Sequence, residues 1–138
     1  MNPYLKQYQQ TQVKTASPEK LLIMLYDGAI QFLNKAKIAI QCKDIQESHN
    51  NIIAAQKILA EFMNTLDMKK GGEVAQNLYN LYEYMHFRLV QANMKKDVVI
   101  IDEVLGFLKD LKTTWEEAIK IASKDKGQPG SSGTIKSA

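Results

Sequence analysis

Few residues of this chain have the type and spacing to do chemistry. Two histidines are present in 138 residues. His86 follows Glu83 at the Glu-x-x-His spacing of di-iron helical bundles, but such a site needs this motif twice together with further glutamates. His49 falls on the expected core face of a helix, where a hydrogen-bonded interior histidine is the simpler interpretation. We therefore expect no metal site and no cofactor.

The other reactive groups also argue against catalysis. Gly71 and Gly72 lack the Lys-Ser/Thr of a phosphate-binding loop, so a helix end followed by a helix start is preferred. Cys42 has no evident base or cationic cluster beside it to activate its thiol. As a single cysteine it cannot form an intramolecular disulfide, which suits a reducing cytosol. We expect a cytosolic protein without enzymatic activity.

Composition narrows the class of partner. Hydrophobic residues make up 45% and charged residues 24% of the chain, which is ordinary for one soluble domain with a real core. The net charge of +3 is small and dispersed, so nucleic acid is not an expected partner. No signal-peptide pattern is present, and no apolar stretch approaches the ~20 residues of a membrane span, so membrane insertion is not expected.

Four amphipathic segments must position whatever site the chain has. Apolar residues recur at helical spacing over residues 18–41, 45–66, 72–92 and 98–122. Ser17, Asp44 and Asp97 stand where helix N-caps are expected. The connections are short, so neighbouring helices should be antiparallel. The predicted fold is all-α: an antiparallel up-down four-helix bundle.

The stripes also predict which side chains face the bundle core. The expected core positions are Leu22, Leu25, Tyr26, Ala29, Leu33, Ala36, Ile40, Ile45, His49, Ile52, Gln56, Leu59, Met63, Val74, Leu78, Leu81, Tyr82, Met85, Leu89, Ile101, Val104, Leu105, Leu108, Leu111, Trp115 and Ile119.

Two terminal segments are expected outside the bundle, which should occupy residues 17–123. Residues 124–138 are rich in Lys, Gly, Ser and Pro, which predicts a disordered tail. Residues 1–16 form a short N-terminal cap segment, in which Tyr4, Leu5 and Tyr8 would share one helix face. So short a helix is marginal alone and must dock on something. It is either a fixed structural cap or a replaceable cover over a ligand groove.

Large apolar residues also occur away from the predicted stripes. Ile58 and Phe62 lie well off the stripe of the second helix, as do Tyr84 and Phe87 on the third and Met24 on the first. These side chains could line one groove between the second and third helices. Apolar grooves of this kind accept amphipathic segments. The alternative is a core wider than one stripe.

Three stretches in register resemble the flagellar secretion chaperone family FliS. They are residues 15–29, 66–75 and 81–93. The resemblance implies a helical bundle with an N-terminal cap that binds the C-terminal segment of flagellin. It also implies that the protein prevents premature flagellin polymerisation and helps deliver flagellin to the export gate of the flagellar type III system.

The resemblance reaches only part of the expected binding surface. Contact residues are transferable around Tyr4 to Tyr8 and over residues 17–29 and 78–93, whereas Ile58 and Phe62 rest on periodicity alone. The competing interpretation is a structural or signalling bundle that self-associates through the same apolar surplus. We expect a monomer or weak self-association.

Overall fold

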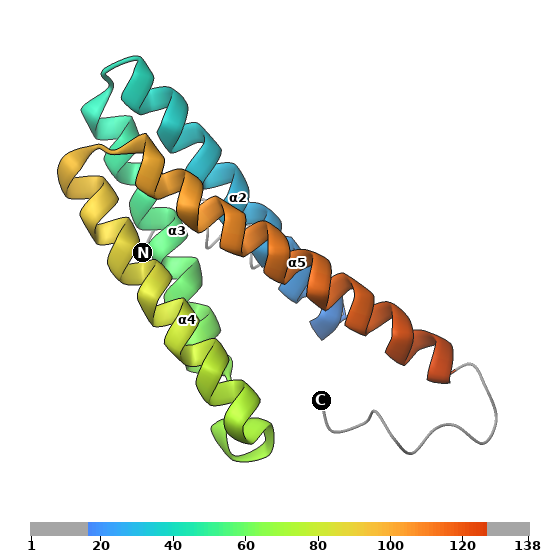
Figure 1. Ribbon diagram of the computed structural model, residues 1–138. Coiled ribbons are helices and arrows are strands. Elements are labelled where there is room, and N and C mark those ends of the chain that lie inside the picture. Colours follow the sequence, from blue (N-terminus) through green and yellow to red (C-terminus); the bar gives the residue numbers. More distant parts are fainter. Residues whose placement is uncertain (1–16, 127–138) are drawn as a thin grey trace.

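The computed structural model describes residues 17–126, and these form four helices. They are α2 (Pro18–Gln41), α3 (Ile45–Thr65), α4 (Met68–Lys95) and α5 (Val98–Lys126), and no strand occurs among the described residues (Figure 1). The predicted four-helix bundle is confirmed. The expected cap segment with Tyr4, Leu5 and Tyr8, and nearly all of the expected tail, lie outside the described residues.

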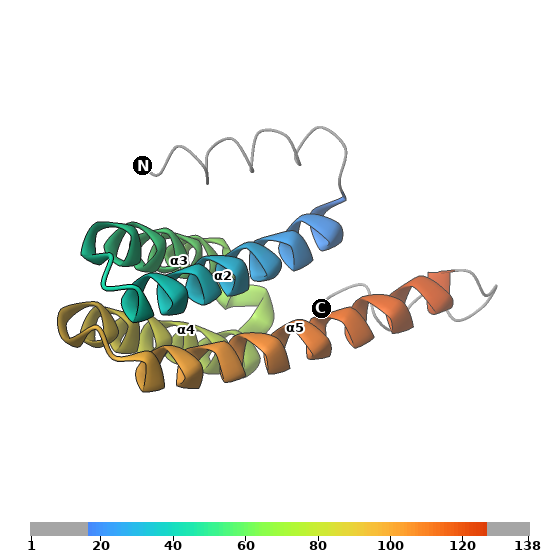
Figure 2. The same cartoon turned by 90° about the horizontal axis from the view of Figure 1, so that it is seen from above.

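The helices form two layers, with α2 and α3 in one and α4 and α5 in the other (Figure 2). Each helix packs on its sequence neighbours, and α2 and α5 close the bundle. Two ion pairs of 2.6 Å join α2 to α5, Lys37 with Asp102 and Asp27 with Lys112. The paired residues step backwards along α2 as they step forwards along α5, so these two helices are antiparallel.

Side-chain caps begin the helices. Ser17 Oγ accepts from the backbone N–H of Lys20 at 3.2 Å, and the Asp44 carboxylate accepts from that of Glu47 at 3.1 Å. Asp97 does the same for Val99 at 2.9 Å. Such caps satisfy backbone donors that have no intrahelical partner, and each contributes about 1 kcal/mol. The three predicted caps are confirmed.

The start of α4 differs from the prediction. Asp67 caps it by accepting from the N–H groups of Lys69 and Lys70, so the helix begins at Met68 and not at Gly72. Gly72 has φ 52° and ψ −128°, and it separates this first turn from the rest of α4 by a kink. A side chain at Gly71 would place its Cβ 2.5 Å from that of Ala75. The Gly-Gly pair therefore permits the kink and the close approach that follows it.

The core is built from all four helices, but three predicted core positions are wrong. Ile45 is 70% exposed, Val74 is 68% exposed, and His49 is also exposed. Ile45 and Val74 lie near helix starts, at the ends of the bundle, where the neighbouring helices do not cover the stripe. His49 is hydrogen-bonded as expected, through Nδ1 to the Asn93 amide nitrogen at 2.9 Å, but this contact lies at the surface.

The apolar surplus of α3 belongs to the core. Ile58 is 1% and Phe62 3% exposed, so the expectation of a free strip on this helix is wrong. The reason is that α3 packs between α2 and α4 and buries a wide arc of its surface. Gly28 of α2 lies against Ile58, since a Cβ there would meet Ile58 Cδ1 at 3.5 Å, an ordinary van der Waals distance. Of the two interpretations left open, the wide core is correct for these residues.

No helix in residues 17–126 is both long and apolar enough to cross a lipid bilayer.

Candidate functional site: an apolar cleft at one end of the bundle

A cleft of about 430 Å3 opens at the end of the bundle that holds the α3–α4 turn. At this end α3 and α4 diverge from the C-terminal half of α5 (Figure 1). All four helices contribute to its walls, which are mostly apolar. The lining residues are Leu22, Phe62, Thr65, Leu66, Asp67, Lys70, Gly71, Val74, Ala75, Leu78, Tyr82 and Trp115.

The rings of Phe62, Tyr82 and Trp115 line this cleft, and Tyr26 contacts them without lining it. Phe62 stacks on Tyr26 with ring centroids 4.5 Å apart and lies 5.2 Å from the ring of Tyr82. The hydroxyl oxygens of the two tyrosines are 2.5 Å apart. The indole Nε1–H of Trp115 donates to Tyr26 Oη at 3.1 Å. One helix supplies each ring, so this cluster exists only when the bundle is assembled.

Burial raises the pKa of both Tyr26 and Tyr82, because an ionised phenol would lose its hydration. Each raised pKa in the folded state favours folding below the unfolded tyrosine pKa of about 10, and this contribution is lost as pH rises. We expect the free energy of unfolding to fall above about pH 10, by up to ~1.4 kcal/mol per pH unit for each tyrosine. Urea titrations at several alkaline pH values measure this dependence.

The control for this prediction is the double variant Tyr26→Phe with Tyr82→Phe. Lysines titrate in the same pH range and affect both proteins alike. The unaltered chain should therefore lose stability more steeply than the double variant. Equal slopes would contradict the role assigned to the buried hydroxyls.

The rim of the cleft combines charged and apolar groups. The Asp67 carboxylate accepts from the backbone N–H groups of Lys69 and Lys70 at 3.1 and 3.0 Å, so its charge is engaged in the helix cap. Two apolar residues also line the cleft, Val74, which is largely exposed, and Leu78, which is half-buried. An apolar side chain from a partner could therefore enter over Val74 and reach the rings within.

The structure does not gather the sequence-predicted site residues in one groove. Phe62 lines the cleft from within the core, and Ile58 is enclosed nearby without lining it. Met24 is half-buried on α2. Tyr84 and Phe87 are exposed on α4 and do not line the cleft. These residues therefore do not line the common groove between α3 and α4 that the sequence predicted.

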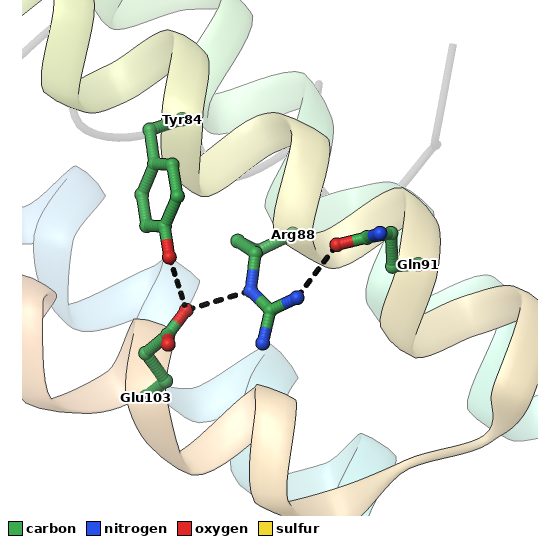
Figure 3. Close-up of polar contacts among 4 residues, drawn as sticks. All are labelled: Tyr84, Arg88, Gln91 and Glu103. Atoms are coloured by element: carbon green, nitrogen blue, oxygen red, sulfur yellow. Dashed lines mark hydrogen bonds and ion pairs between the residues drawn. The ribbon is translucent and has the colours of Figure 1, made fainter.

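Tyr84 turns towards α5 (Figure 3). Its hydroxyl donates to Glu103 Oε1 at 3.2 Å, and the same oxygen accepts from Arg88 Nε at 2.8 Å. Arg88 also donates to Gln91 Oε1 at 2.7 Å. The hydrogen bond to Glu103 raises the pKa of Arg88. The Tyr84 ring meets Phe107 edge-on at 6.1 Å. Tyr84 thus joins α4 to α5.

A second apolar surface lies on the outer face of α4. Phe87, Val90 and Met94 are exposed and follow one another at i, i+3 and i+7, which aligns them on one side of the helix. The sequence prediction identified Phe87 but missed the other two. Their helical spacing from Phe87 was the available signal.

Sequence reasoning also missed the cleft itself. It assigned Leu22, Leu78, Tyr82 and Trp115 to a continuous core, and these residues do lie on the core side of their helices. Helical periodicity reports which way a residue faces, but not whether the opposite helix is still present at that level. Within residues 17–126 no group of three or more His, Cys, Asp or Glu side chains is placed to hold a metal ion.

Comparison with known proteins finds matches to one family. The family model described as "Flagellar protein FliS" matches residues 1–122. The flagellar secretion chaperone FliS of Bacillus subtilis is 39% identical over 129 residues, covering 94% of this chain and 95% of that protein. FliSB of Pseudomonas aeruginosa is 39% identical over 116 residues, covering 81% and 92%. FliS of Salmonella typhimurium is 36% identical over 124 residues, covering 86% and 92%.

Proposed function

The chain belongs to the FliS family of flagellar proteins, and we propose that it is a chaperone that binds the C-terminal segment of flagellin before export. Its relatives are named flagellar secretion chaperones, which supports a chaperone role in flagellar export. The observation that carries the finer proposal is the apolar cleft, open to an incoming segment at one end of the bundle. We assign no enzymatic step and no cofactor to it.

An apolar cleft can keep an amphipathic segment from self-association before export. A disordered amphipathic segment exposes apolar faces and would self-associate, and a helical groove removes those faces from water. Ordering the segment costs free energy, so affinity stays moderate for the surface buried and release needs no nucleotide. Binding of this kind precedes export, so we place the protein in the cytoplasm. Delivery to the flagellar type III export gate would follow.

We assign the partner contacts to two surfaces. The cleft supplies Phe62 and its neighbours, and the outer face of α4 supplies Phe87. From the sequence-based set we keep Tyr4, Leu5, Tyr8, Met24 and Tyr84 as proposed contacts. Ile58 of α3 is buried against α2, so we assign it to the core.

The test is titration calorimetry with flagellin, with and without its C-terminal segment. We expect one flagellin per chaperone and a strongly negative heat-capacity change, the marker of apolar burial. Removing the segment should weaken binding by at least about 100-fold, or ~2.7 kcal/mol. Equal binding by the truncated flagellin would refute the proposal.

The exposed row of Phe87, Val90 and Met94 favours one alternative function, a bundle that self-associates. Molar mass measured by light scattering at several protein concentrations separates the two. A mass that stays at one chain leaves this face available to flagellin, whereas a concentration-dependent dimer supports self-association.

A further inference from the structure

The aromatic cluster behind the cleft holds more hydrogen-bond donors than it can use. Trp115, Tyr26 and Tyr82 bring three protons to two oxygen atoms. The indole N–H donates to Tyr26 Oη, and the 2.5 Å contact between the hydroxyls takes one further proton. One hydroxyl proton remains, and no side chain in the described part of the chain accepts it.

Geometry decides which tyrosine carries the remaining proton. Both tyrosines are nearly enclosed, at 0% and 2% exposure, but only Tyr82 is among the residues that line the cleft. If Tyr82 donated to Tyr26, the spare proton would be enclosed without an acceptor, which is costly. The reverse order runs from Trp115 through Tyr26 to Tyr82 and leaves the spare donor on Tyr82, the one tyrosine of the pair that lines the cleft. Each bond in such a chain also polarises the next.

When no partner is bound, a water molecule in the cleft can accept this hydrogen bond. The cleft volume of about 430 Å3 leaves ample room for water molecules. A bound segment that displaces this water must replace its hydrogen bond or lose affinity.

We infer that Tyr82 donates a hydrogen bond to an amide carbonyl oxygen of the segment that occupies the cleft. The inference rests on the proposed function and adds to it a polar requirement inside an otherwise apolar site. The acceptor is neutral, because a carboxylate would lose its hydration against these apolar walls.

A matched pair of variants tests this inference, with a peptide of the flagellin C-terminal segment as the probe. Tyr82→Phe and Tyr26→Phe both remove the bond between the two hydroxyls, but only Tyr82→Phe removes the donor at the cleft. We expect Tyr82→Phe to weaken peptide binding about 10-fold, or ~1.4 kcal/mol. Tyr26→Phe should stay within about twofold of the unaltered chain.

The outcomes separate the inference from the proposed function. Equal affinities of the two variants, or no loss in Tyr82→Phe, would overturn the inference while the unaltered chain still binds the peptide. Failure of the unaltered chain to bind would refute the proposed function itself.

A peptide series identifies the source of the carbonyl. Each Asn is changed to Leu and each Gln to Met, and each peptide is titrated against the unaltered chain and Tyr82→Phe. A loss seen only with the unaltered chain assigns the acceptor to that side chain. If no change in the peptide removes the effect of Tyr82→Phe, the acceptor is a main-chain carbonyl.

A spectroscopic measurement covers the case in which Tyr82→Phe does not fold. Tyrosine-labelled unaltered protein is bound to the peptide and examined by NMR. The hydroxyl proton of Tyr82 should exchange slowly and show a through-space contact to the peptide. A complex in which that proton contacts only the chaperone would overturn the inference.

Discussion

Phe62→Ser should lower the free energy of unfolding by about 3–5 kcal/mol, the cost of removing a large ring from a packed core. Phe62 is 3% exposed, stacks on Tyr26 and lies beside Tyr82. The substitution leaves a void between these rings and places a hydroxyl inside it. A loss of this size is a large part of the stability of an ordinary domain.

Phe87→Ser is the matched control, because it makes the same chemical change on a ring that is 56% exposed. Its free energy of unfolding should stay within about 0.5 kcal/mol of the unaltered chain. Urea unfolding followed by circular dichroism measures both variants. If Phe62→Ser unfolded like the unaltered chain and lost only flagellin binding, Phe62 would be a free groove residue and its place in the core would be wrong.

Val74→Asp should weaken binding of the flagellin segment by about 100-fold, or ~2.7 kcal/mol. The loss has two sources. A buried valine contributes about 1.5–3 kcal/mol in the complex, and the new carboxylate would have to be desolvated as the partner covers the cleft. Stability should change little, because Val74 is mostly exposed and an acidic residue suits the early part of a helix.

Val99→Asp controls for this second variant. Val99 is also a highly exposed valine near a helix start, but it lies at the opposite end of the bundle and does not line the cleft. Calorimetry should find its affinity for the segment unchanged. If both variants bound as tightly as the unaltered chain, the cleft would not be the binding site. If both lost affinity alike, the effect would come from charge and not from position.

The sequence by itself determined the helices and their caps. Each cap needs only a side chain and a backbone N–H two or three residues later, so Ser17, Asp44 and Asp97 could be identified without a fold. The 3–4 spacing of apolar residues and the short connections then required antiparallel neighbours. The start of α4 was missed because the Asp67 cap and the kink at Gly72 together place one extra turn before the main stripe.

The tertiary structure decided how much of each helix is covered. Periodicity gives the direction of a side chain but not the width of the buried arc, which depends on how closely neighbouring helices approach. Ile58 lies far from the stripe centre yet is 1% exposed, because α2 packs against it at Gly28. Val74 lies on its predicted stripe yet is 68% exposed. It belongs to the first part of α4, at the end of the bundle where α3 and α4 diverge from the C-terminal half of α5 (Figure 1).

The cleft and the aromatic cluster beside it also depend on how the helices pack. Tyr26, Phe62, Tyr82 and Trp115 come from four different helices, and local spacing cannot place their rings or hydroxyls against one another. Packing of the whole bundle brings them together and leaves space beside them where α3 and α4 separate from α5. The spare donor on Tyr82 follows from counting protons in that assembled cluster, which no stretch of the sequence contains.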